Sequence, residues 1–275
     1  ALCAACGLRP GHIDKRFRIV GGNGTTERDW PWQVYYDSPR GNCGGTIISR
    51  HFILTAAHCA EPDAKSVIIY GDRSNRTEQR IESSFIHEQY YMFENDEFGP
   101  EVQNDIMLLR LAEPIEFDNY TQPVCLDAGQ TSFNHGIVTG YGLTVDNETG
   151  TFVSPVELLE ASVEIRNYTD CNEHRSPEFL AAHNLTTHYS IDDTYICAGA
   201  RGRGTLMGDS GGPLVARAED GRFYEVGITS VIRSDHTEVV QRQDIVPAVF
   251  TRVAAYCDWI ANATRGEARC GPPAE

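Results

Sequence analysis

The sequence predicts an antiparallel β protein that ends in one helix. Short apolar or alternating runs, each bounded by Gly, Pro, Asn or Asp, recur along the 275 residues and are typical of strands. Helical spacing is clear only near the C-terminus, and no repeat of fixed period interrupts the strand pattern. The expected strands are residues 46–48, 52–55, 67–70, 106–111, 137–140, 159–165, 214–216, 223–232 and 249–251.

The expected helix covers about residues 252–263, with Thr251 placed to cap its first turn. Four apolar residues follow the i, i+3, i+4, i+7 spacing of one helix face: Val253, Tyr256, Cys257 and Ile260. Residues 266–275 read as a short polar tail. Residues 1–18 combine two cysteines with a basic cluster, which indicates a processing segment and not a folded unit.

Charge and modification patterns limit the function classes. With 23 Lys and Arg against 39 Asp and Glu, the formal charge is −16, and such a surface repels nucleic acid and anionic membranes. We expect no membrane-spanning helix, and the missing initial Met at Ala1 fits removal of a signal peptide. Nine cysteines and seven Asn-X-Thr glycosylation motifs predict a secreted, extracellular glycoprotein; the motifs begin at Asn23, Asn75, Asn119, Asn147, Asn167, Asn184 and Asn262.

Two short segments offer a base and an acid. His58 ends the stretch Thr-Ala-Ala-His after an apolar strand, where an imidazole can serve as a general base. Asp105 begins the apolar run of residues 105–109, and a carboxylate beside so much buried surface must be hydrogen-bonded or paired. Without the other motifs, His58 would more often be a packed or surface histidine, and Asp105 would be interpreted as an acid that caps a strand.

A third segment, Gly-Asp-Ser-Gly-Gly-Pro at residues 208–213, supplies a nucleophile. Glycines on both sides of Ser210 allow a tight turn that exposes the hydroxyl. The same turn points the backbone amides of Gly208 and Ser210 at one place, where the oxyanion of an acyl transfer would form. Together, the three segments predict nucleophilic catalysis.

In this chain order, His58, Asp105 and Ser210 with their flanking motifs resemble the chymotrypsin-like (trypsin-like, S1 family) serine endopeptidases. The resemblance implies that Ser210 attacks the scissile carbonyl, that His58 takes and returns the proton, and that Asp105 orients the imidazole, without any cofactor. It also implies two packed six-stranded β-barrels with the active site between them. The implied peptidase domain is 19–265, with barrels at about 19–130 and 131–250.

The resemblance further implies a zymogen. Arg18, Ile19 and the following Val-Gly-Gly look like the family's activation junction, where cleavage after a basic residue frees an isoleucine amine. That amine pairs with the acid before the nucleophile, here Asp209. A buried ammonium is tolerated only beside a buried carboxylate, so the uncut chain lacks this pair. An activating protease that cuts after Arg18 is therefore an expected partner, together with protein substrates and protease inhibitors.

Cysteine positions are assigned by the same resemblance. Cys43 pairs with Cys59 and Cys171 with Cys197, while Cys125 accepts either Cys3 or Cys6 of the cut segment and keeps it attached. The helix and tail are joined if Cys257 pairs with Cys270. One cysteine of the first segment is then left over. A metal cluster at Cys3 and Cys6 would need two further ligands at zinc spacing, so no metal is expected.

The resemblance places the floor of the pocket for P1, the residue before the scissile bond, at Gly204. An Asp there selects Arg or Lys in the family, so Gly204 disfavours a trypsin-like pocket. The substrate-binding strand, Ser-Trp-Gly in the family, reads Ser230-Val231-Ile232, and Ala248 replaces a second wall glycine. These larger side chains favour small P1 residues such as Ala or Val, which predicts elastase-like cleavage.

Alternatives remain at this pocket. A large apolar P1 fits if the pocket opens deeper, because Leu206 stands where the family has a cysteine whose bridge staples the wall. Asp235 or Asp244 in the following loop offers a charge for a basic P1. The segment between Cys171 and Cys197 is longer than usual and is expected to restrict access or to recognise a partner.

Other functions compete with a broad protease. A regulatory cascade protease of narrow specificity shares the chemistry, and a non-catalytic binding homologue shares the fold. The family's calcium loop would fall near residues 71–82, where Asp72, Glu78 and Glu82 are accompanied by arginines, so a solvated charged loop is expected there.

Overall fold

Six antiparallel strands close into a first barrel. In a computed structural model, residues 6–9, 18–38, 41–60, 66–93, 101–146, 149–174, 176–182, 191–231 and 241–273 are described, without the side chains of residues 18–23, 177 and 180. The strands pair in the order β2-β3-β4-β9-β6-β5, and β5 returns to β2. They are β2 (Gln33–Ser38), β3 (Gly41–Ile47), β4 (Phe52–Thr55), β5 (Val67–Tyr70), β6 (Thr77–Ile86) and β9 (Met107–Leu111).

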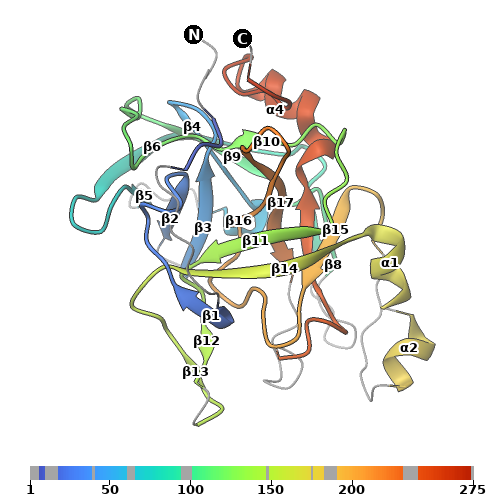
Figure 1. The fold of residues 1–275 in the computed structure, drawn as a ribbon. Coiled ribbons are helices and arrows are strands. Elements are labelled where there is room, and N and C mark those ends of the chain that lie inside the picture. The colour runs from blue at the N-terminus through green and yellow to red at the C-terminus, as the bar shows by residue number, and fades with distance from the viewer. Residues whose placement is uncertain are drawn as a thin grey trace.

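A second ring of six strands follows in the chain. Its order is β14-β11-β16-β17-β18-β15, and pairing of β15 with β14 closes it. The two barrels lie against each other in Figure 1, where the long arrows of β11 and β14 belong to the second barrel. The strands are β11 (His135–Gly140), β14 (Leu159–Asn167), β15 (Tyr195–Gly199), β16 (Pro213–Arg217), β17 (Phe223–Val231) and β18 (Ala248–Arg252). The predicted all-β fold of two six-stranded barrels is therefore confirmed.

Two strands join the second barrel from the N-terminal half of the sequence. Strand β1 (Arg18–Gly24) runs antiparallel to β14, and β10 (Cys125–Leu126) runs parallel to β17. The expected N-terminal barrel at 19–130 thus begins with a strand that belongs to the other sheet. Short hairpins are added by β7 (Tyr91–Phe93) with β8 (Glu101–Gln103), and by β12 (Thr144–Val145) with β13 (Phe152–Val153).

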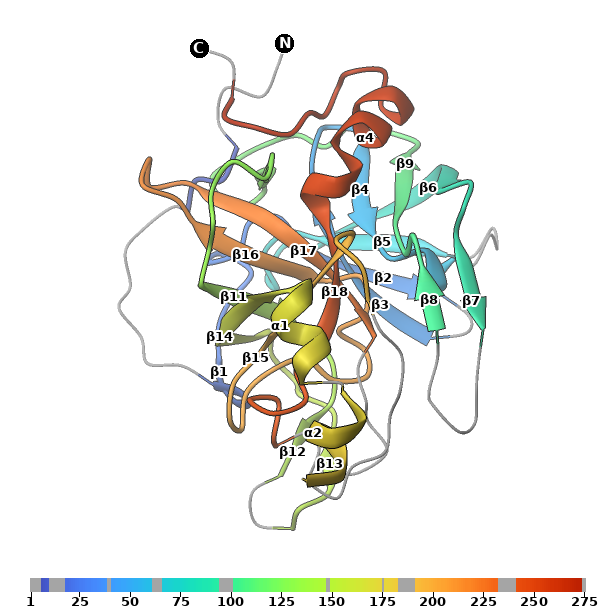
Figure 2. The same cartoon turned by 90° about the vertical axis from the view of Figure 1, so that its right-hand side faces the viewer.

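Among the described residues, helices are few and short. A 3-10 turn, η1 (Ala57–Cys59), follows β4, while α1 (Tyr168–Glu173) and α2 (Pro177–Ala182) lie between β14 and β15. The chain then ends in η2 (Val253–Tyr256) and α4 (Cys257–Ala263), at the top of Figure 2. Among the described residues, no helix is long and apolar enough to cross a membrane.

The apolar core of the first barrel extends into the junction with the second barrel, which also has a core of its own. Trp30 and Trp32, both fully buried, contact Phe223 of β17 with ring centroids 5.5 and 5.8 Å apart. Polar side chains also cross the junction, because the Thr46 hydroxyl donates to Glu225 Oε1 at 3.1 Å. Burial raises the pKa of Glu225 well above its usual value, and its Oε2 has no partner among the described residues.

Four disulfide bonds join cysteines among the described residues. Bonds join Cys43 to Cys59 and Cys171 to Cys197, as the resemblance implied, and Cys257 to Cys270, the bridge considered between helix and tail. Cys6 bonds to Cys125, which decides between the two candidates, whereas Cys3 lies outside the described residues. With Cys6 bonded to Cys125, the rival metal cluster loses one of its two thiolates.

The segment after Cys6 packs on the body of the protein as well as being bonded to it. Gly7 donates its amide to Pro123 O and accepts from the Phe223 amide, both at 2.9 Å. The Arg9 guanidinium lies 4.1 Å from the centre of the Trp30 ring and 3.6 Å from Asp29 Oδ1. Residues 6–9 are therefore anchored by a covalent bond, by backbone pairing and by a cation-π contact.

Candidate active site

His58 and Asp105 are in direct contact. His58 lies in η1 directly after β4, and Asp105 comes two residues before β9, its neighbour in the barrel. The imidazole Nδ1 is 2.7 Å from Asp105 Oδ2, and the His58 backbone amide donates to Oδ1 at 2.9 Å. Two bonds to one carboxylate fix both the ring and the turn that carries it. The Nδ1 proton is thereby assigned to the Asp105 side, which leaves Nε2 able to accept a proton.

The second barrel supplies two more bonds to Asp105. Ser230 of β17 donates its hydroxyl to Oδ2 at 2.5 Å, and Thr251 of β18 donates to the Asp105 carbonyl at 2.9 Å. Ser230, expected as a substrate-binding residue, therefore orients the acid. The expected role of Thr251 as a helix cap is wrong, because Thr251 lies in β18, the N-cap of η2 is Arg252 and the hydroxyl is used at Asp105.

The pair is electrostatically coupled. Burial alone would lower the pKa of His58, but the charge and hydrogen bond of Asp105 outweigh it and raise this pKa above its usual value. Burial acts in the opposite direction on Asp105, whose pKa is nevertheless lowered by His58 and by the Ser230 bond. Asp105 is thus held ionised, although it is fully buried.

Ser210 sits in a turn clamped between the two barrels. Its carbonyl accepts from the amide of Gly44 in β3 at 2.7 Å, and Gly211 donates to Thr229 O of β17 at 2.8 Å. Gly44 follows Cys43, which is disulfide-bonded to Cys59 beside His58. The structure thereby brings the Ser210 turn to the same barrel junction as the histidine and the acid.

Two amides of this turn are left for a ligand. Asp209, Gly211 and Gly212 each donate their backbone N–H to a protein carbonyl. Within the described part of the chain, the amides of Gly208 and Ser210 donate to none. Gly208 has a φ of +95°, a conformation that L side chains rarely adopt, so glycine is required here. This is the arrangement expected of an oxyanion hole.

Asp209 is a buried carboxylate without a cation. It accepts from the amides of Gly142 and Leu206, each at 2.8 Å, and its side chain fills space that a Cβ at Gly140 or Gly142 would occupy. It forms no ion pair with any described residue, and burial raises its pKa to about 6. Arg18 and Ile19 lie in β1, and their side chains are outside the described residues.

Besides Ser230, the structure describes Gly204, Val231 and Ala248 among the residues expected around P1 and buries all three. Gly204 and Ala248 are both buried, and Ala248 pairs with Ala198 at the end of β15. Val231 ends β17 and is also buried, whereas Ile232 and Asp235 lie outside the described residues. Leu206 packs with Val145, with Leu143 and Phe152 nearby, so an apolar cluster stands where the family has a disulfide.

Sequence reasoning missed Gln243. Its side chain lies against Gly204 and donates Nε2 to Thr205 O at 2.8 Å. Asp244, which was considered as a charge for the pocket, has its carboxylate 3.9 Å from Arg242. No pattern in the sequence marks Gln243, because the contact joins residues 38 positions apart.

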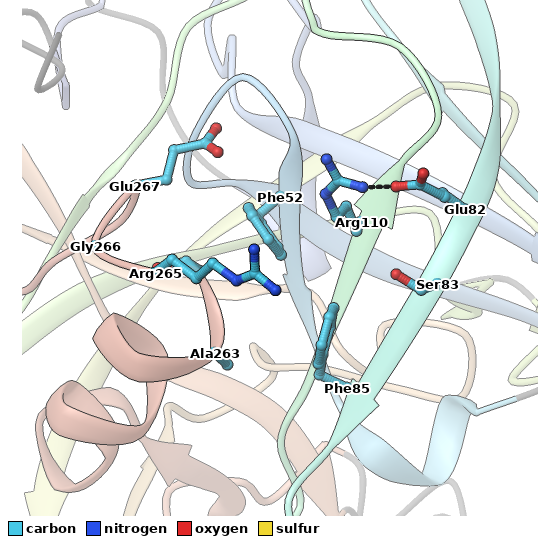
Figure 3. A pocket seen from close by; sticks show the side chains of 10 residues that line it. Phe52, Glu82, Ser83, Phe85, Arg110, Ala263, Arg265, Gly266 and Glu267 are labelled. Carbon is cyan, nitrogen blue, oxygen red and sulfur yellow. Dashed lines mark ion pairs between the residues drawn. The ribbon is translucent and has the colours of Figure 1, made fainter.

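A cavity of about 800 Å³ lies elsewhere, between β4, β6, β9 and the turn after α4 (Figure 3). Phe52, Phe85 and Arg265 line it, and Arg110 forms an ion pair with Glu82 at its rim. None of the predicted site residues lines it. Asp72, in the segment expected to be a solvated charged loop, is also paired with an arginine, Arg28, at 2.7 Å.

Comparison with known proteins agrees with the site. Residues 19–260 match the Trypsin family. The chain belongs to the trypsin family. Human serine protease 41 is 33% identical to it over 268 residues, 93% of this chain and 78% of the relative. Bovine chymotrypsin-C is 29% identical over 276 residues, which cover 94% of each protein.

A third relative of this trypsin-family chain is much longer. Rat complement C1s subcomponent is 30% identical over 270 residues, which are 93% of this chain but only 36% of that protein. Among solved structures, neuropsin, a serine protease expressed in the limbic system of mouse brain, superimposes with a TM-score of 0.66 at 27% identity. The match covers 85% of this chain and 94% of neuropsin. The two closed barrels thus have the chymotrypsin fold, and the relatives support a serine endopeptidase.

Proposed function

We propose that the chain is a secreted serine endopeptidase that works through an acyl-enzyme on Ser210. The observation that carries the proposal is the His58–Asp105 pair at the same barrel junction as the Ser210 turn. In this turn the backbone N–H groups of Gly208 and Ser210 donate to no described carbonyl. Ser210 is the nucleophile and His58 the general base. Asp105 keeps the imidazole oriented and stabilises it when it is protonated.

The reaction has two halves. The Ser210 oxygen attacks the substrate carbonyl carbon while His58 Nε2 takes the hydroxyl proton, and the Gly208 and Ser210 amides stabilise the oxyanion. Collapse breaks the C–N bond, and His58 returns the proton to the leaving amine. Water then attacks the ester by the same route, which releases the acid and restores Ser210.

The buried carboxylate of Asp209 supports a proposal for how the enzyme is activated. We propose that residues 1–18 are an activation segment, that cleavage after Arg18 frees the Ile19 amine, and that this ammonium pairs with Asp209. The uncompensated carboxylate in the uncut chain supports this, because a buried charge is costly until a partner arrives. The Cys6–Cys125 bond would keep the segment attached to the 19–265 peptidase domain.

At P1 we propose small or aliphatic residues, which is elastase-like specificity. Gly204 supplies no carboxylate, and Ala248 and Ile232 are larger than the glycines they replace. Extracellular localisation is supported by four disulfides and by exposed glycosylation motifs at Asn75, Asn119, Asn167 and Asn262. Asn23, Asn147 and Asn184 carry the remaining motifs, with side chains outside the described residues.

A regulatory role in a cascade is the second candidate. The similarity to a complement protease and the inserted helices α1 and α2 favour a narrow protein substrate, with protease inhibitors as further partners.

The test is to cleave the purified chain after Arg18 and to profile it on peptides that vary at P1, with Ser210→Ala as control. We expect cleavage after Ala or Val that is absent from the control. Cleavage only after Arg or Lys refutes the pocket proposal. A lack of turnover on peptides and proteins, with Ile19 exposed as the new terminus, would instead favour a binding homologue.

A further inference from the structure

Gln243 occupies the place from which a side chain at residue 204 would extend. A Cβ built on Gly204 would overlap the Gln243 side-chain amide, and a Cβ on Gly199 would overlap its backbone carbonyl. Two glycines on different segments thus leave the room that Gln243 fills. Gln243 itself is 1% exposed.

The segment that carries Gln243 is fixed from both sides. Gly202 donates to Gln241 O at 2.7 Å, and Ile245 and Val246 close a turn onto Arg242 O at 2.8 and 2.9 Å. Two neighbouring elements also hold it, since Arg166 of β14 donates to Asp244 O at 3.1 Å, and His174, just after α1, places Nδ1 3.0 Å from Ile245 O. The amide is therefore presented by a braced turn and not by a free loop.

Two polar atoms at this place lack partners. The Nε2 bond to Thr205 O fixes the orientation of the Gln243 amide and leaves Oε1 as the remaining acceptor. Oε1 is buried without a hydrogen bond to any described residue, and the same is true of the Thr205 hydroxyl. Buried polar groups in folded proteins normally have a partner, so each unpaired group requires a reason.

We propose that Gln243, together with Thr205, is the floor of the P1 pocket and selects an uncharged P1 side chain that carries a hydrogen-bond donor. A hydroxyl or amide at P1 supplies the partner that both atoms lack. An apolar side chain of the same shape leaves them unpaired. The inference rests on the proposed endopeptidase function; within its small P1 class, it replaces the preference for aliphatic side chains with a preference for side chains that carry a donor.

The same arrangement argues against a cationic P1. The floor is a neutral amide, and the acid next to Gln243 in the sequence, Asp244, has its carboxylate 3.9 Å from Arg242. The segments that pair here carry Arg201, Arg203 and Arg242, which add positive charge. The amide also fills depth that Gly204 would otherwise leave open, which disfavours a long apolar P1.

The test compares kcat/KM on peptide pairs that differ only at P1, Thr against Val and Asn against Leu, with the activated enzyme. Gln243→Met removes the amide at nearly constant length, and Gln243→Glu installs a charge. The exposed Gln241, two residues away, gives the matched controls Gln241→Met and Gln241→Glu. Ser210-dependent labelling by a small fluorophosphonate counts active sites in every variant.

In the parent enzyme we expect at least one donor-bearing substrate to exceed its apolar partner by about tenfold, the effect of one buried hydrogen bond. The ratio should fall towards one in Gln243→Met and persist in Gln241→Met, while Gln243→Glu should gain activity on a P1 Lys peptide. Equal rates within both pairs, or a ratio that survives Gln243→Met, overturn the inference while labelling shows the endopeptidase intact. Absence of labelling in the parent overturns the proposed function and this inference together.

Discussion

Cleavage after Arg18 should remove a pH dependence of stability that Asp209 causes in the uncut chain. Burial raises the pKa of Asp209 from 3.8 to about 6, so the folded uncut chain binds a proton more tightly than the unfolded chain does. Stability then falls as pH rises from about 4 to about 6. The shift of roughly two units corresponds to about 3 kcal/mol of unfolding free energy.

In the cut chain we expect the Ile19 ammonium to lie beside Asp209 and to lower the pKa of its carboxyl group. The carboxylate is then ionised in both states above pH 4, and its contribution is constant. Apart from the Ile19 amine and the Arg18 carboxylate that cleavage creates, the two forms share their titrating groups, Glu225 included, so the effects of the shared groups cancel in the difference. Because Cys6–Cys125 retains the segment, the two forms also contain the same residues.

The measurement is urea unfolding followed by the fluorescence of the three tryptophans, on Ser210→Ala protein before and after cleavage, at pH 4 and pH 7. The difference in unfolding free energy between cut and uncut forms should grow by about 3 kcal/mol between these pH values. Parallel pH profiles, within about 0.5 kcal/mol, would refute the pairing of Ile19 with Asp209.

Three further predictions can be tested. Ser230→Ala removes the hydroxyl that donates to Asp105 Oδ2, so steady-state kinetics should show kcat about tenfold lower with little change in KM. An unaltered kcat would contradict the orienting role of Ser230. Glu225→Gln should stabilise the protein at pH 8, because a buried carboxyl with a raised pKa lowers stability as pH rises. Thermal unfolding should show this gain in stability shrinking towards pH 4, and a gain that is the same at both pH values would contradict the raised pKa of Glu225. The acid limb of kcat/KM should lie above pH 6.5, because Asp105 outweighs burial in raising the pKa of His58, and a limb below 6.5 in the pH–rate profile would count against that coupling.

Much of the fold was readable because strands with one buried face leave a pattern. The run Phe52–Thr55 and the apolar stretch before Leu111 were both predicted, and they pair side by side. β6 was missed because most of its residues are exposed, so its polar sequence shows no alternation. The partner of β1 was unreadable for another reason, since pairing across barrels depends on distant packing.

The site was predictable to the extent that its chemistry is local. Ser210 and its glycines form one turn, and His58 and Asp105 each follow or precede an apolar strand. Gln243 was not predictable, because its position depends on two distant glycines and on contacts that Arg166 and His174 make with its segment. Thr251 was misassigned because a hydroxyl before a helix signals a cap, whereas in the fold this hydroxyl donates to the Asp105 carbonyl across the barrel junction.

The anchoring of residues 6–9 has a consequence for where the protein acts. Hydrolysis after Arg18 divides the backbone, yet the Cys6–Cys125 bond and the Arg9 contact with Trp30 do not depend on that peptide bond. Anything joined to the chain ahead of Cys6, such as a targeting module or an affinity tag, would remain with the catalytic body and carry it to a chosen surface. Only a reductant that reaches this disulfide would separate cargo from enzyme.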